Sequence, residues 1–221
     1  MRLLMFDFDG TLVDSQANIV HCMTSAFRAE NLPPPSPQQV RRIVGLSLEL
    51  AIEALLPGGE VHLAPTVAMH YREAFFARRQ MPDFQEPLYD GALEALDRLA
   101  GPETLLGIAT GKNLRGLRAA LERHGLADRF ATLQTPDHNP SKPHPGMLLK
   151  AMAETGCTPE RTVLVGDTTF DMEMAGHASV RALGVSWGYH APEELSDRGA
   201  VAILQSFREL PAAVERIVEA G

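Results

Sequence analysis

The feature that most constrains the fold is an alternation of short apolar runs with helical segments. The apolar runs are Leu3–Phe6, Leu105–Ala109, Ala131–Leu133, Val163–Val165, Ala182–Val185 and Val201–Leu204. Each is short and ends in polar or glycine-containing sequence, as buried parallel strands do. Helical patterns lie between most of them, at 91–100, 114–124, 145–155 and 171–178, and another closes the chain at 206–219. This order predicts an α/β protein, a doubly wound parallel sheet with helices on both faces.

One interval departs from the alternation. Between Ser15 and Glu86 the sequence has helical patterns at 17–30, 37–44, 48–55 and 62–80 and no pattern typical of a buried strand. A crossover between parallel strands needs only one helix. At 221 residues the chain is also long for one compact domain and short for two. We therefore expect residues 15–86 to form an inserted helical cap over a core made of residues 1–14 and 87–221.

Composition narrows the classes of partner. The chain carries 20 Lys and Arg against 28 Asp and Glu, a net charge of −8, and has no basic run, which disfavours nucleic acid as a partner. Its two cysteines, Cys22 and Cys157, show no CxxC spacing, so neither a disulfide nor a zinc cluster is expected. No stretch approaches the ~20 apolar residues of a membrane span. We expect a cytoplasmic protein without a membrane or nucleic-acid partner, a monomer or weak dimer.

Two aspartates follow the first apolar run directly, in Asp7-Phe8-Asp9-Gly10-Thr11-Leu12. Residues two apart on a strand point to the same side, so both carboxylates can enter one space. On a strand their backbones lie about 6.6 Å apart, and at an effective dielectric near 20 the two charges repel by roughly 2–3 kcal/mol. The alternative is a solvated loop with two surface aspartates. In a functional pair, a cation or a shared proton would offset this repulsion. The pair also lies at the strand end, where open parallel sheets place ligands.

A second acidic segment follows the run Val163–Val165. Asp167 comes just after this run, and Asp171 lies one helical turn further on. Together with Asp7 and Asp9 they offer the oxygen ligands that Mg²⁺ prefers. Capping of the next helix is the alternative for both residues, and Asp171 can do both. For Asp167 the sequence favours metal binding.

Two further segments add groups suited to binding phosphate. Thr110-Gly111-Lys112-Asn113 follows the second run and precedes a helix, where a hydroxyl and exposed amides form a phosphate cradle. Lys142 stands before Pro143, and an ammonium held there can neutralise charge as a phosphate bond breaks. Each signal alone is weak, because Thr, Gly and Asn are also ordinary turn residues. His144 is a candidate base, although a surface position fits it better.

In this order the four segments closely resemble the signature of the haloacid dehalogenase (HAD) superfamily, and the resemblance covers nearly the whole chain. It is strongest in residues 7–15, Asp7-Phe8-Asp9-Gly10-Thr11-Leu12-Val13-Asp14-Ser15. It implies a Rossmann-like core in which Asp7 attacks phosphorus and becomes an aspartyl phosphate. Asp9 would protonate the leaving oxygen and then deprotonate water. An aspartate in the position of Asp9 is typical of the phosphatases and mutases of the family, whereas the metal-free dehalogenases usually lack it.

The resemblance also implies roles for the remaining segments. Thr110 and Gly111 would bind the phosphoryl group, and Lys142 would hold the nucleophile and the developing charge. Magnesium would be held by the Asp7 carboxylate, the Asp9 main-chain oxygen and the Asp167 carboxylate. Asp171 would support that set of ligands.

The placement of the helical insert resembles the subgroup that contains phosphoglycolate phosphatases, pyrophosphatases and sugar phosphomutases. The segment Ser186-Trp187-Gly188-Tyr189 is similar to the phosphoglycolate phosphatase branch. Gly111 departs from the pattern, since many relatives have asparagine there, and this puts the details of substrate binding in doubt.

Candidates for substrate selection in the cap are Arg41, Arg42 and the turn around Gly45-Leu46-Ser47, with His21 and Lys112 as further possibilities. Solvated arginines are the ordinary alternative. The sequence thus predicts a Mg²⁺-dependent phosphatase for a small phosphate monoester. A phosphomutase or pyrophosphatase of the same family remains open, and so does a non-enzymatic phospho-receiver. A receiver fits less well because the aspartate pair ends the first strand and because the chain has a helical insert.

Overall fold

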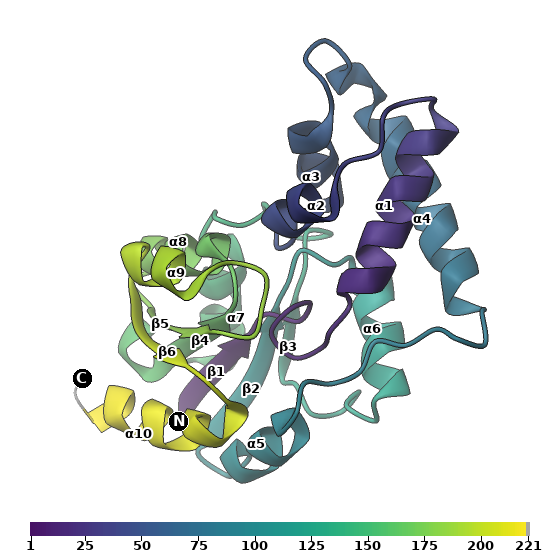
Figure 1. Ribbon diagram of the computed structural model, residues 1–221. Helices are drawn as coiled ribbons and strands as arrows, with labels where there is room; N and C mark the ends of the chain where they lie inside the picture. Colours follow the sequence, from purple (N-terminus) through teal and green to yellow (C-terminus); the bar gives the residue numbers. More distant parts are fainter. Residues whose placement is uncertain (220–221) are drawn as a thin grey trace.

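A parallel sheet forms the centre of the protein (Figure 1). The structure is a computed structural model that describes residues 1–219, and within them the sheet has six strands in the order β3-β2-β1-β4-β5-β6. Every pair of neighbours is parallel. The strands are β1 (Arg2–Phe6), β2 (Thr104–Ala109), β3 (Thr132–Gln134), β4 (Thr162–Gly166), β5 (Arg181–Val185) and β6 (Ala200–Leu204).

Helices cover both faces of this sheet. The side chains of β1 alternate, so Leu4 and Phe6 join one hydrophobic cluster while Leu3 and Met5 join another. The first cluster includes residues of α5 (Ala92–Leu99), α6 (Leu114–Arg123) and α10 (Leu210–Glu219). The second includes residues of α7 (Gly146–Thr155), α8 (Thr169–His177) and α9 (Pro192–Asp197). The predicted doubly wound α/β fold is confirmed.

The chain between β1 and α5 forms a separate helical layer above the carboxyl ends of the strands (Figure 1). Its helices are α1 (Gln16–Ala29), α2 (Pro37–Ile43), α3 (Leu48–Leu55) and α4 (Ala64–Arg79), with a short 3₁₀ turn at Val61–Leu63. They surround a hydrophobic cluster of their own that includes Met23, Phe27, Val40, Ile52 and Val67. From this separate cluster we infer that residues 15–86 form the cap.

The cap joins the core through two chain segments that run side by side. Val13 and Leu88 form an antiparallel bridge. The Asp14 N–H donates to Pro87 O at 2.9 Å, and the Tyr89 N–H donates to Leu12 O at 3.0 Å. The cap therefore leaves the core and returns to it at one place.

Further contacts between cap and core lie away from these connections, among them the following two. Arg42 on α2 pairs with both carboxylate oxygens of Glu194 on α9, at 2.6 and 2.7 Å. The Ser47 N–H donates to Ser141 Oγ at 2.7 Å. The cap thus also contacts the core away from the two connecting segments.

The main difference from the expected elements is α9, which the apolar pattern does not reveal. This helix has six residues, too few to show an amphipathic repeat, although Pro192 at its first position and Glu193 and Glu194 behind it are helix-start signals. The helix expected at 171–178 begins earlier, at Thr169, because Thr168 and Asp171 form a capping box.

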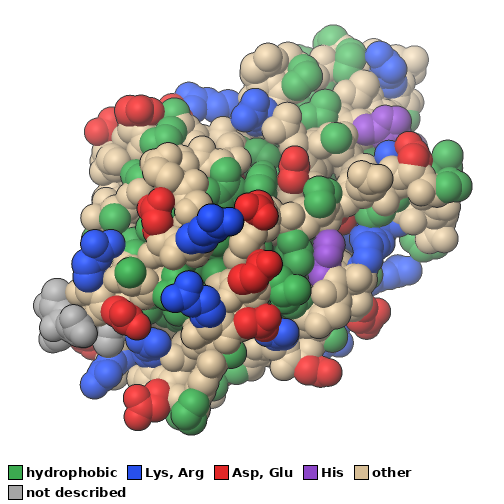
Figure 2. All heavy atoms as spheres, turned by 60° about the horizontal axis from the view of Figure 1, so that its bottom comes forward, with side chains coloured by type: hydrophobic (Ala, Val, Ile, Leu, Met, Phe, Trp, Pro, Cys, Tyr) green, Lys and Arg blue, Asp and Glu red, His purple; other side chains and the backbone are tan. Residues whose placement is uncertain are grey.

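The described part of the chain contains no helix long and apolar enough to span a membrane. On the face shown in Figure 2, basic and acidic side chains are interspersed rather than gathered by sign. This mixed surface agrees with the absence of basic runs in the sequence.

Truncation of a core side chain tests the packing of the sheet. Phe6 is completely buried in β1, and Phe6→Ala should lower the free energy of unfolding by about 3–5 kcal/mol because it removes apolar contacts and leaves a cavity. The measurement is urea unfolding followed by circular dichroism. Leu149→Ala on the solvent side of α7, where Leu149 is 48% exposed, should change it by no more than about 0.5 kcal/mol. Equal effects of the two substitutions would contradict the assigned core.

Candidate active site

The acidic segments meet where the order of the strands reverses. β1 and β4 are neighbours in the sheet but far apart in sequence, and ligands of open α/β sheets bind outside the carboxyl ends of strands at such a switch point. Asp7 follows β1 directly, and Asp167 follows β4. Asp171 lies in the first turn of α8. Carboxylate oxygens of these three residues lie within 4.8 Å of one another, and all three residues are buried.

Lys142 lies among these carboxylates, and its ammonium group is completely buried. Nζ contacts Asp7 Oδ1 at 3.0 Å and Asp171 Oδ1 at 2.6 Å. The other Asp171 oxygen accepts from Thr168 N and Oγ1, at 3.1 and 2.6 Å. Asp171 thus has both oxygens in use. Asp7 differs, because its Oδ2 is buried and accepts no hydrogen bond within residues 1–219.

Asp167 lies in a space that two glycines leave open. A Cβ atom on Gly10 or Gly188 would lie well inside 3.0 Å of the Asp167 side chain. Gly10 also has φ of +91°, a conformation that other residues rarely adopt. The Asp167 oxygens accept from Thr11 Oγ1 at 2.7 Å and from the Tyr189 N–H at 2.9 Å. These contacts fix the carboxylate, which forms no ion pair with a lysine or arginine in the described part of the chain.

The charges of this cluster do not balance. Three ionised carboxylates and one ammonium leave a net charge of −2 in a buried space, which is unfavourable without further compensation. Burial, and then the neighbouring Asp171, raise the pKa of Asp7 to about 7 in spite of Lys142. Burial, Asp7 and Asp171 raise the pKa of Asp167 well above its usual range. Burial opposes the charge of Lys142, yet Asp171 and Asp7 outweigh it and raise its pKa.

The residues present fit a divalent cation. A charge of +2 would offset the excess of carboxylates, and the ligand atoms are oxygens, as Mg²⁺ prefers. The Asp7 and Asp167 carboxylates are the best-placed side-chain ligands, whereas Asp171 is engaged by Lys142 and Thr168. The Asp9 carboxylate is not part of the cluster, in agreement with a main-chain role for Asp9 in metal binding.

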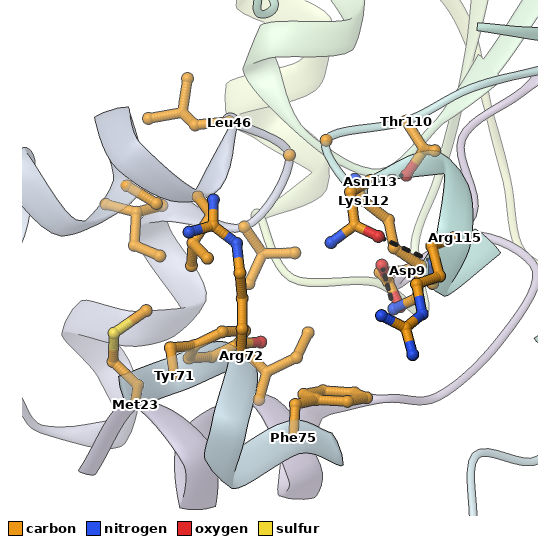
Figure 3. Close-up of a pocket in the computed structure, with 18 of the residues that line it drawn as sticks. Asp9, Met23, Leu46, Tyr71, Arg72, Phe75, Thr110, Lys112, Asn113 and Arg115 are labelled. Atoms are coloured by element: carbon orange, nitrogen blue, oxygen red, sulfur yellow. Dashed lines mark hydrogen bonds and ion pairs between the residues drawn. The ribbon is translucent and has the colours of Figure 1, made fainter. Parts of the chain in front are cut away.

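The Asp9 side chain instead contacts Lys112 on the facing side of the site (Figure 3). Both Asp9 oxygens lie 2.9 Å from Lys112 Nζ, and the two side chains are only 10% and 9% exposed. Lys112 Nζ also lies 5.9 Å from the Phe8 ring centroid and 5.3 Å from that of Phe75 on the cap. The pair therefore stands at the boundary between core and cap.

Thr110 and Gly111 lie at the carboxyl end of β2, beside Asp7 and Asp9 in the lining of one cavity. The Thr110 hydroxyl accepts from the Lys112 N–H at 3.2 Å. A Cβ on Gly111 would lie well inside 3.0 Å of the Leu46 carbonyl oxygen. Glycine at this position thus allows the cap turn to approach the proposed phosphate-binding turn closely.

A cavity of about 220 Å³ lies between the core and the cap (Figure 3). Asp9, Thr110, Lys112, Asn113 and Arg115 line one side, Met23, Tyr71 and Arg72 the other, and Phe75 lies between them. This volume suits a small ligand.

The structure places some of the candidate substrate-selecting residues at the cavity and others away from it. Gly45 and Leu46 line the cavity, as does Lys112, but Arg41 and Arg42 do not. Arg42 is engaged with Glu194 instead. His21 lies at a groove on the outer side of α1 and α4. His144 is exposed and accepts from the Gly146 N–H, outside the cavity.

Helix α4 contributes cavity residues that the sequence reading missed. Tyr71, Phe75 and Arg79 line the cavity and follow each other at intervals of four, so they share one face of the helix. That spacing is visible in the sequence. By itself the spacing does not identify a site, because two aromatic residues and an arginine on one face are equally compatible with cap packing.

Gly188→Ala should weaken Mg²⁺ binding. The added Cβ would overlap the Asp167 side chain, and displacing a packed group costs about 1–3 kcal/mol, so the dissociation constant measured by calorimetry should rise about tenfold or more. Gly176→Ala is the matched control, because a Cβ there meets no atom within 4 Å. An unchanged Mg²⁺ affinity in Gly188→Ala would show that Asp167 is not a ligand.

The comparisons with known proteins agree with this geometry. Residues 4–185 match the family model described as haloacid dehalogenase-like hydrolase. A protein of Dickeya dadantii named "Probable phosphatase IndB" is 33% identical over 98% of this chain and 95% of its own length. The N-acetylmuramic acid 6-phosphate phosphatase of Pseudomonas aeruginosa is 31% identical, over 98% of this chain and 96% of the relative. The phosphoglycolate phosphatase of Agrobacterium fabrum is 29% identical, over 99% and 95%.

The fold is also shared with solved structures. A hydrolase from Pseudomonas syringae superposes with a TM-score of 0.84 at 24% identity, covering 98% of this chain and 99% of that one. The family match spans most of the chain, and the relatives cover nearly all of it. The chain therefore belongs to the haloacid dehalogenase-like hydrolases.

Proposed function

We propose that this phosphatase hydrolyses a small phosphate monoester through a phosphorylated aspartate, Asp7, with the help of Mg²⁺. The observation that carries the proposal is the state of the Asp7 carboxylate. One oxygen is held by Lys142 and the Phe8 N–H, at 3.0 and 2.6 Å, while the other is buried and has no partner within residues 1–219. A fixed carboxylate with one uncommitted oxygen is suited to nucleophilic attack.

The reaction proceeds in two steps. An Asp7 oxygen attacks phosphorus, the bond to the ester oxygen breaks, and Asp9 donates a proton to that leaving oxygen. Asp9 then takes a proton from water, which attacks the phosphorus of the aspartyl phosphate and releases inorganic phosphate. Lys142 stabilises charge on the transferred group, and Thr110 and Gly111 hold its oxygens.

The cation would be held by the Asp7 and Asp167 carboxylates and the Asp9 main-chain oxygen, with Asp171 fixing Lys142 beside them. When bound, Mg²⁺ supplies positive charge for the phosphoryl oxygens. Thr11 and the Tyr189 N–H orient Asp167 for this purpose, since both donate to its oxygens.

The size of the cavity and the relatives support a small substrate. Relatives of comparable length are named phosphoglycolate phosphatase and N-acetylmuramic acid 6-phosphate phosphatase. The volume of about 220 Å³ favours a short ester such as phosphoglycolate over a large one.

Replacement of the nucleophile should remove turnover. Asp7→Asn keeps the size of the side chain but not its nucleophilicity, so phosphate release from a panel of phosphorylated metabolites should fall on the order of a thousandfold or more. Removal of Mg²⁺ with a chelator should have a similar effect on the unmodified protein.

Asp14→Asn is the matched control for Asp7→Asn, because Asp14 lies on the same loop but is exposed. Undiminished turnover in Asp7→Asn would defeat the mechanism, and turnover after thorough chelation would remove the metal from it. Isomerised sugar phosphate without free phosphate would identify a phosphomutase instead.

Asp9→Ala separates the two steps. With p-nitrophenyl phosphate, whose leaving group needs no proton, Asp7 should still be phosphorylated, whereas hydrolysis should slow by about 10²–10⁴-fold because the water has lost its base. Phosphorylated protein should then accumulate and be visible by mass spectrometry after an acid quench. Its absence at all times, with slow turnover persisting, would argue against a covalent intermediate.

A further inference from the structure

The surroundings of Asp9 define the place of the leaving group, because Asp9 is the residue proposed to protonate the leaving oxygen. Asp9 is held by Lys112, and Lys112 Nζ lies 5.3 Å from the Phe75 ring centroid. The guanidinium of Arg79 lies 4.9 Å from the same centroid. The Phe75 ring therefore lies close to two cationic side chains, on the side of the site where the leaving group must lie.

Some of the cationic side chains around this part of the cavity form an ion pair with a carboxylate, and others do not. Lys112 is paired with Asp9, and Arg72 with Glu49 on α3. Arg79 and Arg115 also line the cavity, and neither forms an ion pair with any carboxylate of residues 1–219. The leaving-group end of the cavity thus contains two arginines that form no ion pair with the described carboxylates.

Arg79 is held in position although it forms no ion pair with a described carboxylate. Its Nη2 donates to Gly116 O at 3.2 Å, and its Nε is buried with no hydrogen-bond partner in the described chain. Burial lowers the pKa of Arg79, although Glu86 partly opposes this. Glu86 itself pairs with Arg123 at 3.4 Å.

Arg115 completes the arrangement from the core side. It is exposed in the first turn of α6, and its guanidinium lies 6.0 Å from the centroid of Phe76 on α4. Figure 3 places Arg115 on the Asp9 side of the cavity. A cap arginine and a core arginine therefore border the same end of one small cavity.

We propose that Arg79 and Arg115 form a subsite for a second anionic group, a carboxylate or a phosphate, on the leaving group of the substrate. The planar guanidinium group matches both kinds of anion and binds them through paired hydrogen bonds. This inference rests on the proposed phosphatase activity. The small cavity requires the second anionic group to lie close to the ester oxygen, so the substrate class is a short phosphorylated acid or bisphosphate.

Three esters of one two-carbon skeleton test this subsite: 2-phosphoglycolate, ethylene glycol bisphosphate and 2-hydroxyethyl phosphate. The first two carry a second anionic group and the third a hydroxyl. The quantity measured is the ratio of kcat/KM for each ester with an anionic leaving group to that for 2-hydroxyethyl phosphate, whose leaving group is neutral. Arg79→Gln and Arg115→Gln should each lower this ratio about tenfold or more, mainly through KM. The larger of the two wild-type ratios identifies carboxylate or phosphate.

Arg118→Gln is the matched control, because Arg118 is exposed one turn beyond Arg115 and does not line the cavity. It should leave the ratio unchanged. A merely structural role of the two arginines would lower kcat/KM for all three esters equally, and that result overturns the subsite. A wild-type protein without preference for the esters with an anionic leaving group overturns it as well. Arg115→Gln keeps the test decisive if Arg79→Gln does not fold.

Failure of the phosphatase proposal is distinguishable from failure of the subsite. If the wild-type protein releases no phosphate from any ester, the proposed function fails, and calorimetric binding of the same esters to Asp7→Asn protein decides the subsite. Tighter binding of the two esters with an anionic leaving group, lost on adding Arg115→Gln, supports it. Equal binding of all three esters contradicts it.

Discussion

The contact of the buried Lys142 ammonium with Asp7 and Asp171 is the interaction on which the site depends. Without it, three carboxylates would share a buried space in which no described lysine or arginine pairs with them. With it, the charge is reduced to one that a divalent cation can neutralise. The contact also joins three segments of the chain, since Asp7 follows β1, Asp171 lies in the first turn of α8 and Lys142 precedes α7. Chemistry and folding therefore rely on the same ion pairs.

Around this charged centre, glycines let neighbouring groups approach closely because they have no side chain. Gly10 and Gly188 make room for Asp167, and Gly111 makes room for the Leu46 carbonyl of the cap. The first two glycines serve the core alone. Gly111 instead lets the cap approach the core, so the depth of the cavity depends on a residue in the proposed phosphate-binding turn. Gly111 thus has a steric counterpart in the cap, the Leu46 carbonyl.

The sequence predicted the sheet and the acidic cluster well, for one physical reason. Buried parallel strands are short, continuous apolar runs, and polar residues just beyond them must meet at one edge of the sheet, which placed Asp7, Asp167 and Asp171 correctly relative to the strands. The sequence could not show which arginines and lysines form ion pairs, because this depends on partners distant in sequence, such as Glu194 for Arg42. The cap arginines expected to face the substrate were therefore Arg41 and Arg42, while the cavity contains Arg72 and Arg79.

The bridge between Val13 and Leu88 has a consequence for how such a protein can change. Since the cap leaves and re-enters the core at neighbouring residues, its removal would open a gap that a short turn could close without altering the strand register. The helical layer is thus interchangeable in principle, as a loop on a scaffold is. A different insert between the same two residues would present other groups to an unchanged phosphoryl-transfer centre, so recognition and catalysis can evolve independently in this architecture.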